Sequence, residues 1–92
     1  MSITDLRKEI DTLDDAILDA FLRRMDVCLR IAEYKRENAI AVTDTERERQ
    51  VISSIEQKSP PELCEYTKEL FLKIMELSKS AQSKIVNGEN HE

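Results

Sequence analysis

Two positively charged side chains interrupt an apolar helical face, and such cations can hold a small anion. At about 100° per residue, one stripe collects Leu6, Ile10, Leu13, Ile17 and Phe21, followed by Arg24, Cys28, Ile31 and Lys35. Arg24 and Lys35 therefore point where a core is expected, and buried cations need an anionic partner. Three other cations of this stretch fall off the stripe and can face water: Arg23, Arg30 and Arg36.

Other polar side chains interrupt two further apolar faces. Asp44 and Glu48 align with Val51 on the apolar face of a second stretch, so a carboxylate points inward there. In a third stretch, Ser78 and Gln82 lie one helical turn apart and face partly inward, on the shoulder of the main apolar stripe. That main stripe comprises Leu63, Leu70, Ile74, Leu77 and Ala81.

Taken singly, each of these polar residues has a purely structural explanation. Arg24 or Lys35 can extend its charge to solvent and pair with Glu48. The Ser78 hydroxyl can bond to its own helix backbone, and Gln82 can be solvated. Taken together, the inward cations outnumber Glu48, and a small dianion bound inside the bundle would restore the charge balance.

The composition argues against several other classes of function. Nineteen acidic against 14 basic residues give a net charge of −5, which disfavours nucleic acid or a membrane surface as a partner. Cys28 and Cys64 form no CxxC pair and the single histidine, His91, lies in a polar tail, so no metal site or histidine-activated nucleophile is indicated. Without a secretory-signal pattern or a membrane-spanning apolar run, we expect a cytoplasmic protein.

The same sequence predicts an all-α fold with three helices per chain. Glycine occurs once, proline occurs only at positions 60 and 61, and alternating β-branched runs are absent. Cap signals place the helices from the Ser2-x-x-Asp5 pattern to about Glu37, from a Thr43-x-x-Glu46 capping box to just before Ser59, and from about Pro61 to Ile85. Residues 1–86 form one expected domain, and residues 87–92 form a tail that we expect to be disordered.

The first predicted helix is too long for the rest of the chain to cover. At 1.5 Å per residue it is a rod of roughly 50 Å, and two shorter helices cannot enclose it on both sides. A chain of 92 residues is also only marginally able to bury a core of its own. We therefore expect a second copy of the chain to cover it.

The order and spacing of five short motifs resemble the all-helical chorismate mutases. These motifs are Leu6-Arg7-x-x-Ile10-Asp11-x-Leu13-Asp14, Arg23-Arg24, Ala32-x-x-Lys35, Val42-x-Asp44-x-x-Arg47-Glu48 and Ser78-x-x-x-Gln82. The resemblance implies an intertwined antiparallel homodimeric helical bundle. It also implies conversion of chorismate to prephenate by a Claisen rearrangement, in phenylalanine and tyrosine biosynthesis, with no cofactor, no metal and no covalent intermediate.

The resemblance also assigns roles to residues by their position in the motifs. Arg24 and the Arg7 of the partner subunit would hold the two carboxylates of chorismate. Lys35 and Gln82 would donate hydrogen bonds to the ether oxygen from opposite sides, and Lys35 would also touch a carboxylate.

The remaining implied contacts surround the ring. Glu48 and the backbone N–H of Asp44 would hold the ring hydroxyl, and Ser78 would help with the ring carboxylate. Ile31 would form an apolar wall, and Arg47 would support the cluster.

Two positions depart from the family pattern, and two other functions stay open. Ala41 stands where the family often has proline and Thr43 where it often has a basic residue, so we expect a looser loop before the second helix. An isochorismate-pyruvate lyase of similar helical fold and a non-catalytic helical dimer module are the alternatives. The inward Arg24, Lys35 and Glu48 argue against the non-catalytic module, since apolar residues there would stabilise a pure scaffold better.

Overall fold

The first helix is long because no glycine or proline interrupts its sequence. A computed structural model describes residues 1–88 and places α1 at Ile3–Glu37. The Ser2 side chain caps the helix by accepting a hydrogen bond from the backbone N–H of Asp5 at 3.1 Å, which confirms the predicted start. The helix ends at the Asn38 C-cap, followed by Ala39 with a φ of 53° in the left-handed region.

The second helix, α2, spans Thr45–Lys58 and begins later than predicted. Its N-cap is Asp44, whose Oδ1 accepts a hydrogen bond from the backbone N–H of Arg47 at 3.0 Å. The expected capping box led by Thr43 is therefore wrong. An ionised carboxylate caps at least as well as a threonine hydroxyl and also interacts favourably with the helix dipole, which explains the shift by one residue.

A tight turn joins α2 to the last helix. A 3₁₀ turn, η1, spans Pro61–Leu63 and leads directly into α3 at Cys64–Val86. The turn is held by a 2.7 Å hydrogen bond between the Ser59 and Thr67 hydroxyls. Just beyond it, Lys68 Nζ lies 3.0 Å from Glu56 Oε2, and this contact raises the pKa of Lys68 above its usual 10.5.

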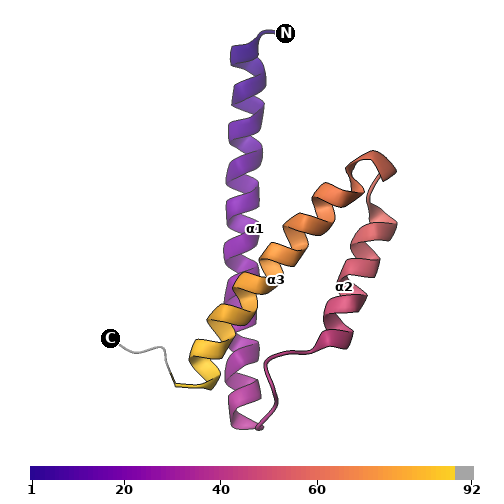
Figure 1. The fold of residues 1–92 in the computed structure, drawn as a ribbon. Helices are drawn as coiled ribbons and strands as arrows, with labels where there is room; N and C mark the ends of the chain where they lie inside the picture. Colours follow the sequence, from indigo (N-terminus) through magenta and orange to yellow (C-terminus); the bar gives the residue numbers. More distant parts are fainter. Residues whose placement is uncertain (89–92) are drawn as a thin grey trace.

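The helices are arranged around α3, which packs against α1 and also against α2 (Figure 1). α2 and α3 form a hairpin, and α3 crosses the second half of α1, so the first half of α1 extends away from both. The resulting body is thin, with principal extents of 54 × 33 × 14 Å. None of the helices described in residues 1–88 has the length and apolar character needed to span a membrane.

Few apolar side chains are buried in this arrangement. Within residues 1–88, Ala32 and Met75 are the hydrophobic side chains that are buried. The three leucines of the main stripe of α3 are exposed, with Leu70 at 53%, whereas its other members, Ile74 and Ala81, are half-buried. The shoulder with Ser78 and Gln82 is buried more deeply. The crossing with α1 selects which face of α3 is covered, and a single-helix pattern does not specify that crossing.

Candidate active site

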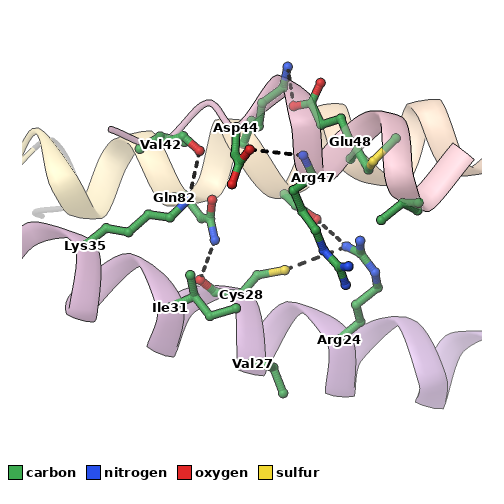
Figure 2. A pocket seen from close by; sticks show the side chains of 14 residues that line it. Arg24, Val27, Cys28, Ile31, Lys35, Val42, Asp44, Arg47, Glu48 and Gln82 are labelled. Atoms are coloured by element: carbon green, nitrogen blue, oxygen red, sulfur yellow. Dashed lines mark hydrogen bonds and ion pairs between the residues drawn. The ribbon is translucent and has the colours of Figure 1, made fainter. Parts of the chain in front are cut away.

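A cavity of about 510 Å³ lies between the second half of α1, the start of α2 and the second half of α3 (Figure 2). Its polar lining consists of four cations, two carboxylates and two uncharged groups: Arg24, Lys35, Arg47 and Lys79; Asp44 and Glu48; Ser78 and Gln82. The cations exceed the carboxylates by two. A molecule with two negative charges would balance this lining.

Arg24 is held in place by uncharged groups. Its Nη1 lies 2.7 Å from the Ser78 Oγ and 3.7 Å from the Cys28 Sγ, and it donates to both. The Ser78 hydroxyl in turn donates to the Ile74 carbonyl at 2.8 Å. No carboxylate in residues 1–88 forms an ion pair with Arg24, so the charge and the other guanidinium N–H groups are available to an anion.

Lys35 and Gln82 reach the same cavity from α1 and α3. The Lys35 Nζ donates to the Val42 carbonyl at 2.9 Å, which fixes the lysine against the loop before α2. The Gln82 Nε2 donates to the Cys28 carbonyl at 2.9 Å, and Gln82 is only 7% exposed. Because an ammonium has three N–H donors and an amide has two, both groups retain donors for a ligand.

The start of α2 supplies the carboxylates. Asp44 caps the helix, and one turn later Glu48 Oε2 lies 3.1 Å from the Nζ of Lys79 on α3. Arg47, whose backbone binds the Asp44 carboxylate, also lines the cavity with its exposed side chain. This wall of the cavity therefore carries both hydrogen-bond acceptors and positive charge.

The cavity contains eight of the nine residues that the sequence suggested. They are Arg24, Ile31, Lys35, Asp44, Arg47, Glu48, Ser78 and Gln82. Arg7 is the exception: it lies in the exposed first turns of α1, about 40 Å from Lys35 along the helix. A single chain therefore does not bring Arg7 to this site.

The off-stripe arginines behave as the pattern predicts. Three ion pairs along α1 link Arg23 to Asp19, Arg30 to Asp26 and Arg36 to Glu33. The side chains of Arg23 and Arg30 are mostly exposed, and that of Arg36 is about half exposed, at 49%. Each of these three charges is paired with a carboxylate on the same helix, whereas Arg24 and Lys35 line the cavity.

Lys79 is a cavity residue that the sequence reading missed. It follows Ser78 directly and lies one turn after Met75, so its helical position gave a partial signal. Its partner Glu48 is on another helix, and pairing between helices is not visible in a single-helix pattern.

Within residues 1–88, no three histidine, cysteine, aspartate or glutamate side chains converge as a metal site would require.

Comparisons with known proteins give a family match and a curated relative. The family model described as chorismate mutase type II matches residues 6–83. A curated relative, the 4-amino-4-deoxychorismate mutase of Streptomyces pristinaespiralis, is 46% identical over 46 residues, which cover 50% of this chain and 36% of the relative. The chain thus matches about a third of the length of that relative. No solved structure matches at a comparable level of significance.

Proposed function

Since the chain belongs to the chorismate mutase type II family, we propose that its cavity converts chorismate to prephenate, the step that leads to phenylalanine and tyrosine. One observation carries the proposal. A cavity with two more cations than carboxylates also holds two hydrogen-bond donors, Lys35 and Gln82, that come from different helices. Chorismate is a dianion with an ether oxygen between its two halves.

The rearrangement transfers no proton and no electron between enzyme and substrate. Bond breaking runs ahead of bond making, so negative charge grows on the ether oxygen in the transition state. Donors such as Lys35 and Gln82 stabilise that charge more than the ground state. Removing one donor of this kind typically costs about 3–4 kcal/mol of transition-state stabilisation.

The cations would also select the reactive shape of the substrate. Chorismate is flexible, and the methylene carbon of its enolpyruvyl group must approach the ring carbon that carries the ring carboxylate before the new bond can form. Arg24, anchored on Ser78, would bind one carboxylate in a fixed position, with Lys35 touching a carboxylate from the end of α1. Fixing both ends of the molecule lowers the entropic barrier.

We further propose that the protein works as an antiparallel homodimer in which Arg7 of the partner subunit completes each site. The first half of α1 supports this, because its stripe is exposed in one chain: Ile10 is 55%, Leu13 57% and Ile17 61% exposed. Burying such a face is favourable by about 25 cal/mol per Å². Two first helices that run antiparallel would place the start of one beside the later part of the other.

Several cavity groups would orient the ring of chorismate. The Glu48 carboxylate, with the Asp44 backbone N–H, would hold the ring hydroxyl, and Ile31 would form an apolar wall. Ser78 would assist with the ring carboxylate, and Arg47 would support the cluster at the start of α2. All of these groups line the cavity in one chain.

The direct test is consumption of chorismate by the purified protein, with the product identified by NMR. We expect prephenate and no pyruvate. Isochorismate is offered separately, and release of pyruvate from it would favour the related lyase instead. Failure to turn over either compound, together with no thermal shift from a dianionic transition-state analogue, would favour a non-catalytic helical dimer.

A further inference from the structure

The ion pair between Lys79 and Glu48 joins two helices inside the cavity wall. Nζ and Oε2 are 3.1 Å apart, and the side chains of Lys79 and Glu48 are 39% and 29% exposed. Most other ion pairs in residues 1–88 link side chains three or four positions apart on one helix. The pair between Lys79 and Glu48 instead links α3 to α2, and it holds the positive charge of Lys79 beside Glu48, one of the two cavity carboxylates.

Glu48 is the cavity acceptor best placed for a donor on the substrate ring. The anionic groups of a chorismate-like dianion go to the arginine and lysine side chains, which leaves its ring hydroxyl to find an acceptor. Asp44 already caps α2 through the Arg47 N–H. A carboxylate has about four acceptor positions, so Glu48 can bind Lys79 and still accept another hydrogen bond.

We infer that Lys79, acting through Glu48, makes the site prefer a ring hydroxyl over a ring ammonium, and so selects chorismate against its 4-amino-4-deoxy analogue. This inference rests on the proposed function and deepens it. A hydroxyl donates one hydrogen bond to Glu48 and brings no charge. An ammonium would compete with the Lys79 ammonium for the same carboxylate, and the two like charges beside Glu48 would repel each other.

Charge balance leads to the same conclusion. Replacing the hydroxyl of chorismate by an ammonium lowers the net negative charge of the substrate by one. Removing Lys79 lowers the positive charge of the cavity by one and frees Glu48 to pair with that ammonium. A positive charge at residue 79 therefore suits a neutral ring hydroxyl, whereas an uncharged residue 79 suits a ring ammonium.

The test compares kcat/KM for chorismate and 4-amino-4-deoxychorismate in the parent and in Lys79→Met. We expect the parent to prefer chorismate, and the ratio of the two values to move toward the amino substrate by about tenfold or more in the variant. A merely structural defect lowers both values together and leaves the ratio unchanged. Lys79→Arg keeps the charge and should keep the parent's preference.

A matched control lies on the same helix. Lys73 is exposed and pairs with Glu76 at 3.5 Å, outside the cavity, so Lys73→Met should leave the ratio as in the parent. An unchanged ratio in Lys79→Met would overturn the inference while leaving the proposed function standing. A parent that prefers the amino substrate would overturn the inference and would also contradict chorismate as the substrate of the proposed function. A parent inactive on both substrates would overturn the proposed function, and the inference with it.

Discussion

The two halves of α1 carry one continuous stripe but differ in what covers it. In residues 3–20 the stripe is exposed, with Leu13 at 57%, although its members are aliphatic. In residues 21–37, α3 crosses the helix, Ala32 is fully buried, and Arg24 and Cys28 are half-buried. An amphipathic pattern thus specifies which face of a helix is to be covered but not which element covers it.

The difference extends to the chemistry of the two halves. The covered half supplies Arg24 and Lys35 to the cavity, where α3 contributes Ser78 and Gln82. The exposed half supplies an apolar face and Arg7, which lies too far along the helix to reach the cavity of its own chain. We assign the second half of α1 to building the site and the first half to pairing with a second chain.

The largest expected effect comes from placing a charge on the exposed stripe. In Leu13→Asp, dimer formation would bury an unpaired carboxylate, which costs several kcal/mol by order of magnitude. We expect sedimentation at micromolar concentration to shift from dimer to monomer, with loss of activity. Thr12→Asp adds the same charge on another face, where Thr12 only bonds to the Lys8 carbonyl, and should stay dimeric. A Leu13→Asp protein that remains a folded, active dimer would contradict the assignment.

Two neighbouring arginines in the covered half of α1 lie on different faces of the helix, and their variants test which face contributes to the active site. Arg24→Ala removes a cavity cation and should lower kcat/KM by about a hundredfold, near 3 kcal/mol. Arg23→Ala removes a solvated arginine whose partner is Asp19 and should stay within about twofold of the parent. Circular dichroism melts check that both variants fold. Equal losses in the two variants would mean that the cavity is not the active site.

A smaller and pH-dependent effect is expected at Gln82. In Gln82→Glu, the new side chain can donate to the ether oxygen only when protonated, and as a carboxylate it would repel both the growing charge and the Cys28 carbonyl. Burial raises the pKa of such a carboxyl group, because the charged form is desolvated. Activity of the variant should fall as pH rises through that pKa, whereas the parent has no such dependence. If the pH profile of Gln82→Glu parallels that of the parent, Gln82 does not face the ether oxygen.

The smallest effect concerns an ion pair distant from both halves of α1. The Glu56 carboxylate raises the pKa of Lys68 in the folded protein, so the stabilisation is complete below pH 10.5 and is lost as pH rises through the folded-state pKa. Lys68→Met should therefore lower Tm slightly at pH 8, and the difference from the parent should shrink at higher pH. Activity at pH 8 should be unchanged. A Tm difference that grows with pH would contradict this assignment.

Local signals predicted most of the fold. The Ser2 cap and the absence of breakers predicted α1. The stripe positions of Arg24 and Lys35 and the shoulder position of Gln82 predicted that these residues face inward, and all three line the cavity. The cap of α2 was misplaced by one residue because Thr43 and Asp44 are both good caps and only the loop geometry decides between them.

Features that depend on how helices cross were not predicted. The crossing of α3 over α1 leaves Leu70 and Leu77 exposed and buries the shoulder with Gln82. The contact between Lys79 and Glu48 likewise needs two helices to be placed in space. By contrast, the resemblance assigns Arg7 to the site of the partner subunit, and its separation of roughly 40 Å from Lys35 within one chain means that this proposed role needs a second copy.

The central claim is that each active site is shared between two chains, and mixed dimers test it most directly. Arg7→Ala and Lys35→Ala should each be nearly inactive alone. After subunit exchange, a mixed dimer holds one site with both defects and one with neither, because the intact Lys35 of one chain meets the intact Arg7 of the other. Random exchange makes half of the dimers mixed, so about a quarter of all sites should regain parental activity. Demonstrated exchange without any recovery of activity would contradict the account.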